Sequence, residues 1–174
     1  FSAVNMVISP IYGHHYGQRN FEKIQINYMR VLLFTPIIGG MILVGSINFA
    51  PELLALWVGK EGNAGFEVII ILGLYGLVLS FIHSHMALVS AINIIRFVPI
   101  LGFCEALLNL FFSVILANYI GIKGVALGTL LGGLFSMVCL PILISKESEI
   151  KFPFNWKHST YQFSFIIIPV VFLS

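Results

Sequence analysis

Long stretches without a charged residue constrain the fold of this chain more than any other feature. Residues 31–50, 68–95 and 124–145 contain no Asp, Glu, Lys or Arg, and residues 97–122 contain only Glu105. A helix of about 20 apolar residues crosses a bilayer. Transmembrane β-strands are shorter and alternate in polarity. The sequence therefore predicts an all-α, polytopic transmembrane helical bundle with four complete spans.

Composition excludes a water-soluble domain. Hydrophobic residues make up 59% and charged residues 9% of the 174 residues, whereas soluble domains are about half apolar and a quarter charged. The formal net charge is only +2, and no basic run accompanies it. We therefore expect membrane lipid as a partner and no nucleic acid. Metal-ligand spacing, phosphate-binding loops and nucleophile motifs are absent, so we expect no catalytic residue, metal or cofactor.

Both ends of the sequence lie inside apolar segments. Residues 1–12 and 161–174 are each too short to cross a bilayer. We therefore expect a partial span at each end. We interpret residues 1–174 as one transmembrane region belonging to a longer chain.

The distribution of Lys and Arg predicts the orientation. Most of these residues lie in every second connection, namely residues 13–30, the surroundings of Arg96, and residues 146–160. Cytoplasmic loops of membrane proteins carry the excess of Lys and Arg, so we predict that these three connections are cytoplasmic. Tyr28 then belongs to the aromatic belt at the inner membrane surface.

Glu105 is the one charged residue inside a predicted complete span. An ionised carboxylate in hydrocarbon is costly unless it is paired or hydrated. Asn109 and Ser113 share its helical face, because they follow at spacings of four. Glu105 and Asn109 are therefore candidates for a substrate or ion pathway. The alternative is a neutral carboxylic acid that is hydrogen-bonded to a neighbouring helix.

His83 and His85 lie near the middle of the predicted span 68–95 and point to nearly opposite helical faces. His83 shares its face with small residues such as Gly76 and Ala87. The sequence favours a hydrogen-bonded packing role for both histidines over a proton relay. We keep His83 as a pathway candidate.

Small residues at every fourth position predict a tight helix contact. They are Gly124, Gly128, Gly132 and Ser136. Such a stripe lets two helix backbones approach closely. The pattern indicates packing and does not indicate chemistry.

Pro36, Gly39 and Gly40 predict a kink or hinge in the first complete span. Proline removes a helical hydrogen bond, and glycine loosens the following turn. A hinge would suit alternating access, but a static kink is the favoured interpretation.

One segment, residues 105–140, resembles the penultimate helix pair of polysaccharide-exporter flippases in the multidrug/oligosaccharidyl-lipid/polysaccharide superfamily. The pattern consists of Asn109-Leu110, the rest of a helix, and then Gly121-Ile122-x-Gly124-x-Ala126-x-Gly128-Thr129. Residues 51–72 are similar to an outer loop of that family and the helix after it. Residues 9–23 are similar to the end of an earlier helix and its cytoplasmic loop.

The resemblance implies the C-terminal half of a longer, MATE-like transporter, with the N-terminal half of the same chain as a partner. Such proteins reside in the bacterial inner (plasma) membrane. They move undecaprenyl-pyrophosphate-linked oligosaccharide to the outer leaflet by alternating access, for polysaccharide or O-antigen export. The cations for the pyrophosphate come either from the missing half or from Arg30 or Arg96 near the inner face.

Three other functions remain open. One is a cation-coupled multidrug antiporter of the same superfamily, for which a membrane carboxylate such as Glu105 is equally suited. Another is a membrane-embedded polysaccharide polymerase or ligase, although the predicted outer loops are short for such chemistry. The last is a non-catalytic assembly subunit.

Overall fold

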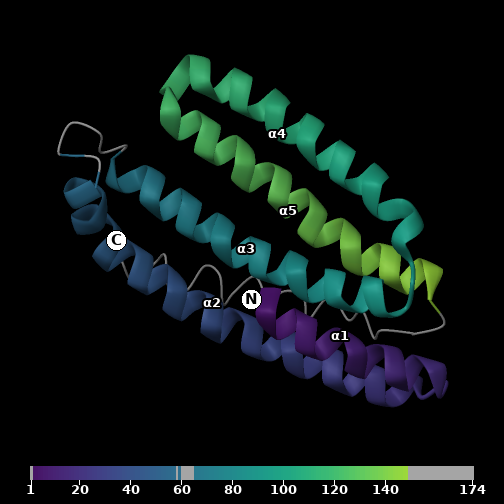
Figure 1. Ribbon diagram of the computed structural model, residues 1–174. Helices are drawn as coiled ribbons and strands as arrows, with labels where there is room; N and C mark the ends of the chain where they lie inside the picture. The colour runs from purple at the N-terminus through teal and green to yellow at the C-terminus, as the bar shows by residue number, and fades with distance from the viewer. Residues whose placement is uncertain (1, 58, 60–64, 149–174) are drawn as a thin grey trace.

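The structure is a computed structural model that describes residues 2–57, 59 and 65–148 (Figure 1). Within these ranges every regular element is a helix. The elements are α1 (Ser2–Gly17), α2 (Phe21–Trp57), α3 (Phe66–Ala91), the short 3₁₀ helix η2 (Ile95–Phe97), α4 (Val98–Ile120) and α5 (Ile122–Glu147). Four of the described helices are long and apolar enough to cross a membrane, which confirms the predicted all-α polytopic bundle. The predicted partial span 161–174 lies outside the described residues.

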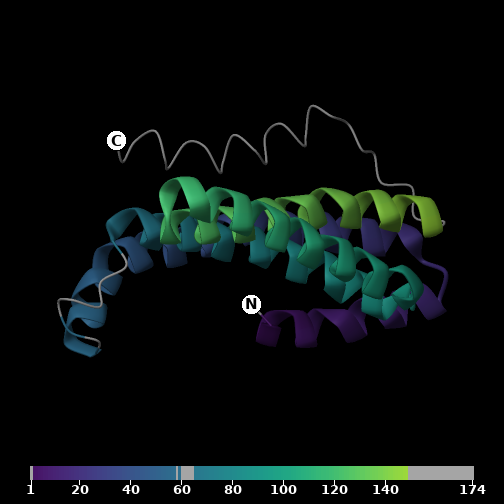
Figure 2. The same cartoon turned by 90° about the horizontal axis from the view of Figure 1, so that it is seen from above.

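The four long helices lie side by side in the order α2, α3, α5, α4 (Figure 1). Chain neighbours run antiparallel because their connections are short. Helix α4 packs chiefly against α5, α5 against α3, and α3 against α2. Helix α1 lies on one side of this layer, where it contacts α2 and α3 (Figure 2).

The connection between α1 and α2 is much shorter than the predicted loop. The prediction of a loop over residues 13–30 was wrong, because only residues 18–20 lie between the two helices. Arg19 has a φ of 54°, and the Asn20 backbone N–H donates to the His15 carbonyl at 2.9 Å, which closes the end of α1. The Asn20 side chain then caps the first turn of α2. A polar segment can remain helical because its backbone groups stay paired.

Two further turns separate α3, α4 and α5. Asn93 has a φ of 59°, and the Ile94 N–H donates to the Val89 carbonyl at 3.1 Å, so α3 ends before the uncharged segment does. Only Gly121 separates α4 from α5, and its φ of 64° is one that glycine adopts without steric cost. These turns place η2 and the α4–α5 turn at opposite ends of the bundle (Figure 1).

The ends of the bundle differ in their positive charge. One end holds residues 18–20, residues 92–97 and the C-terminal end of α5 (Figure 1); we call it the 18–20 end. Most of the described Lys and Arg side chains lie near it: Arg19, Lys23, Arg96 and Lys146. At the other end, the Lys123 ammonium pairs with the Glu67 carboxylate and joins the first turns of α5 and α3. Both partners are exposed, so this pair contributes at most about 1 kcal/mol.

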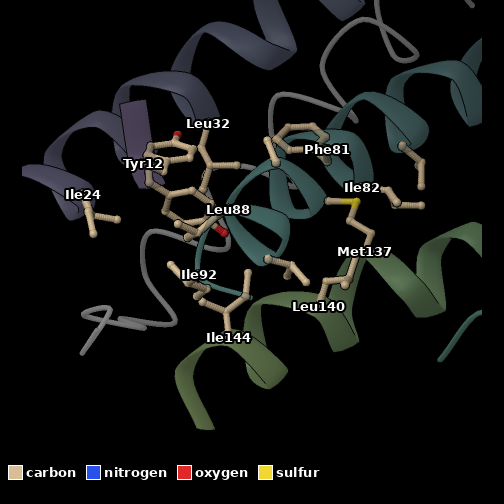
Figure 3. Packing of buried hydrophobic residues seen from close by; sticks show 14 of the residues in the cluster. Tyr12, Ile24, Leu32, Phe81, Ile82, Leu88, Ile92, Met137, Leu140 and Ile144 are labelled. Carbon is tan, nitrogen blue, oxygen red and sulfur yellow. The ribbon is translucent and has the colours of Figure 1, made fainter. Parts of the chain in front are cut away.

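The core lies where α1, α2, α3 and α5 meet (Figure 3). Tyr12, Phe81, Leu88, Leu140 and Ile144 are each almost completely buried there. Helix α4 contributes no buried residue, and most of its apolar side chains are exposed. An apolar face of this kind suits lipid or another transmembrane helix.

The positions of the connections predict a labelling pattern. In a variant with Cys104 and Cys139 replaced by alanine, we expect single cysteines in Arg19→Cys and Asn93→Cys to react with an impermeant maleimide only from the cytoplasmic side. We expect Lys123→Cys to react only from the outside, because it lies at the opposite end of the bundle. Intact cells and inverted vesicles supply the two sides. Reaction of all three cysteines from one side would contradict the topology.

Candidate functional site

Glu105, Asn109 and Ser113 of α4 lie along α5, and their polar atoms are paired there. The Ser136 hydroxyl donates a hydrogen bond to Glu105 Oε2. Asn109 Oδ1 accepts hydrogen bonds from the Ser113 hydroxyl at 2.9 Å and from the Thr129 hydroxyl at 3.3 Å. The polar stripe of α4 is therefore a contact surface between the two helices.

The small-residue stripe of α5 faces this polar stripe at very short range. A Cβ atom at Gly128 would lie 2.2 Å from Ser113 Oγ and 2.5 Å from its backbone nitrogen. A Cβ atom at Gly124 would lie 2.2 Å from the carbonyl carbon of Leu116. At Gly132 the nearest atom would be 3.0 Å away. No side chain larger than hydrogen fits at the first two positions without a backbone shift.

Glu105 is half-buried, and its contact with Ser136 is the one that the hydrogen-bonded interpretation requires. The carboxyl group gains a donor from the neighbouring helix, which lowers the cost of placing it in hydrocarbon. The same carboxylate is not fully enclosed. Its role in a substrate or ion pathway therefore stays a prediction.

The structure does not bring Arg96 and His83 to the α4–α5 contact. Arg96 is exposed in η2, where its guanidinium lies 5.5 Å from the centre of the Phe97 ring. His83 is half-buried on α3, and no described residue forms a hydrogen bond with it. The four pathway candidates predicted from sequence thus do not form one cluster.

The predicted hinge residues lie in a continuous helix. Helix α2 extends through Pro36 without a break in its assignment. Gly39 is a packing position, because a Cβ atom there would lie 2.4 Å from Leu77 Cδ1, whereas a Cβ atom at Gly40 would meet nothing within 4 Å. Bending at this point stays a prediction.

A second polar contact lies between α2 and α3. The predicted hydrogen-bonded packing role of His85 is confirmed there, whereas its partner was not predicted. Tyr28 Oη and His85 Nδ1 are 2.5 Å apart and form a buried hydrogen bond. The hydroxyls of Thr35 and Ser84 share another at 3.0 Å. The prediction that Tyr28 belongs to an aromatic belt was wrong, since this residue is only 2% exposed. The sequence feature that indicates such a contact is the seven-residue spacing of Tyr28 and Thr35, which places both residues on one face of α2, two turns apart.

Metal-ligating side chains are dispersed in the described part of the chain. No group of three or more His, Cys, Asp or Glu residues there could hold a metal ion. Cys104 and Cys139 are free, half-buried thiols. In this part of the chain the polar side chains form hydrogen bonds and not a metal site.

Comparison with known proteins gives no relative for this chain. No protein-family model matches it, and neither a curated protein nor a solved structure does.

The close approach at Gly128 predicts a stability defect. We expect Gly128→Ala to lower the free energy of unfolding by about 1–3 kcal/mol, because the added methyl group would clash with the backbone of α4. Thermal unfolding in detergent micelles measures this. Gly102→Ala is the matched control on α4, since a Cβ atom there meets nothing within 4 Å. Equal unfolding midpoints for both variants would contradict the close contact.

The buried Tyr28–His85 hydrogen bond predicts a second defect. We expect Tyr28→Phe to cost about 1–3 kcal/mol of stability, because the buried His85 Nδ1 would lose its partner. Tyr119→Phe is the control, since Tyr119 is 82% exposed. The thermal midpoint should fall in the first variant and stay unchanged in the second. An unchanged midpoint in Tyr28→Phe would show that the hydrogen bond adds nothing to stability.

Proposed function

We propose that this chain is part of a flippase that moves undecaprenyl-pyrophosphate-linked oligosaccharide across the bacterial inner membrane by alternating access. The observation that carries the proposal is the α4–α5 pair. The residues whose order and spacing resemble the flippase helix pair, including Asn109, Gly124 and Gly128, are the ones that make the contact between α4 and α5. The residues that carry the resemblance are therefore also residues that hold α4 and α5 together.

The physical task of such a protein fits this bundle. The sugar-pyrophosphate headgroup must pass the apolar part of the membrane while the polyprenyl tail stays in lipid. The polar side chains of α4 are paired at its contact with α5, and on this proposal the half-buried Glu105 is the group that also faces the passage. Helix α4 is open on its other faces, where Phe103, Leu107 and Leu110 are exposed. On this proposal the open faces meet lipid or the N-terminal half of the transporter.

Short connections favour transport over the enzymatic alternative. A membrane-embedded polymerase or ligase needs a large loop outside the membrane with groups for sugar-phosphate chemistry. Of the connections that are described completely, residues 18–20 and 92–97 lie at the predicted cytoplasmic end, and Gly121 lies at the predicted outer end. None of them is long enough to form such a site.

The cation-coupled multidrug antiporter is the second candidate, and Glu105 favours it. A carboxylate inside the bundle would attract a cationic substrate directly. The flippase needs cations for the pyrophosphate instead. Arg30 and Arg96 are exposed and supply positive charge outside the α4–α5 contact. Substrate assays separate the two candidates.

Replacement of Glu105 by glutamine tests both the site and the function. Glutamine keeps an acceptor oxygen for Ser136 but removes the charge. We expect Glu105→Gln in the full-length transporter to slow translocation of labelled lipid-linked oligosaccharide in proteoliposomes at least about tenfold. The amount of protein in the membrane should stay constant.

Ser136→Ala is the matched control, because it removes the hydrogen bond and keeps the carboxylate. We expect this variant to retain transport. A parallel loss of protein and transport in Glu105→Gln, or no loss of either, would assign Glu105 a structural role. Transport of a cationic dye without transport of the oligosaccharide would favour the antiporter.

A further inference from the structure

Four cationic side chains at the 18–20 end form no ion pair with any described residue. They belong to Arg19, Lys23, Arg96 and Lys146, and each of these residues is exposed. At the opposite end, the Lys123 ammonium already has the Glu67 carboxylate as its partner. Guanidinium and ammonium groups donate hydrogen bonds and accept none. The donors of the four groups are therefore available to an anionic ligand.

The fold brings these cations to one end from segments that are far apart in the sequence. A Cβ atom at Gly13 would lie 3.9 Å from the carbonyl oxygen of Ala91, so the last turns of α1 lie against the end of α3. Ile92 and Ile144 belong to the same buried cluster, which places the end of α5 beside the end of α3 (Figure 3). Three chain segments that carry cations therefore meet at the 18–20 end.

Carboxylates do not neutralise this end. Its described acidic residues are Glu22 and Glu147, both of them exposed. Glu22 lies in the first turn of α2, where a negative charge interacts favourably with the helix N-terminus. Neither carboxylate forms an ion pair with a described residue. Four cations against two carboxylates leave the 18–20 end positively charged.

An exposed apolar or aromatic side chain lies within four residues of each cation. In the order of the four cations, these neighbours are Tyr16, Ile26, Ile95 and Ile142, with exposed fractions of 39%, 44%, 52% and 50%. A cation next to an exposed apolar side chain suits the boundary between lipid headgroups and acyl chains, because the charge stays in the polar layer while the apolar group enters the chains. A water-soluble anion would require the charge alone.

We propose that the 18–20 end binds the headgroups of anionic phospholipids. The four cations donate hydrogen bonds to phosphate oxygens, and the exposed side chains beside them lie among the first methylene groups of the acyl chains. Each basic group near a membrane surface strengthens the attraction to anionic lipid about fivefold. This end is the one that the distribution of Lys and Arg predicts to be cytoplasmic. The inference does not depend on the proposed transport.

Native mass spectrometry of the full chain in detergent micelles tests the proposal. The micelles contain equal amounts of phosphatidylglycerol, which is anionic, and phosphatidylcholine, which is zwitterionic. The spectrum gives the amount of each lipid bound to the protein. We expect the wild type to bind phosphatidylglycerol in excess. Lys146→Gln should weaken that binding about fivefold, and the combined variant Arg19→Gln, Lys23→Gln, Arg96→Gln and Lys146→Gln should bind both lipids equally.

Lys123→Gln is the matched control, because it removes one lysine of the same helix at the opposite end of the bundle. The two single variants change the net charge equally, so only the position of the lost charge differs between them. We expect the control to bind phosphatidylglycerol as the wild type does. Thermal unfolding in the same micelles confirms that each variant is folded. If the combined variant does not fold, Arg19→Gln replaces it, with the same fivefold weakening expected.

Any of three results would contradict the proposal. Equal binding of the two lipids by the wild type would show that the end does not select anionic headgroups. Equal weakening in Lys146→Gln and Lys123→Gln would show that net charge matters and its position does not. Complete displacement of phosphatidylglycerol by millimolar inorganic phosphate or pyrophosphate would assign the cations to a soluble anion or to a pyrophosphate headgroup instead.

Discussion

Within hydrocarbon every backbone N–H and C=O group must be paired inside the protein, and this requirement shapes the whole chain. It favours unbroken helices across the apolar stretches, and α2 continues even through Pro36 and Pro51. Polar side chains follow the same rule. Ser80 and Ser84 each donate to the carbonyl four residues earlier, at 2.8 and 2.9 Å. Asn118, which is exposed on α4, does so at 3.0 Å. These three side chains therefore satisfy hydrogen-bonding groups within their own helix.

Hydrophobic burial does not favour contacts between helices over contacts with lipid, because lipid tails are as apolar as leucine side chains. Other interactions must therefore hold the helices together. Two helix pairs solve this differently. Helices α4 and α5 bring their backbones together at glycines and add the bond between Glu105 and Ser136. Helices α2 and α3 interlock instead: Leu77 occupies the space beside Gly39, and Leu43 occupies the space beside Gly73. Buried hydrogen bonds, including that between Tyr28 and His85, then fix their register.

The features that sequence could predict are those that depend on one helix at a time. Apolar length predicts the spans, and spacing predicts that the glycines of α5 share one face. Contacts between distant segments were beyond reach. The partner of His85 is Tyr28, 57 residues away, and only the relative shift of α2 and α3 determines that pairing. The loop predicted over residues 13–30 failed for a related reason, since polarity shows where a chain leaves the bilayer and not where its helix ends.

The two kinds of contact also differ in what movement they permit, which bears on the proposed transport. A shift of one residue along the axis moves a helix by about 1.5 Å, and the contact at Gly128 leaves no space for it. Helices α4 and α5 must therefore move as one body. The layer continues from α5 to α3, where Gly133 meets the ring of Tyr75 through side-chain atoms alone. Side chains can change rotamer where backbones cannot yield, so the α3–α5 contact at Gly133 is better able to shift than the α4–α5 contact at Gly128.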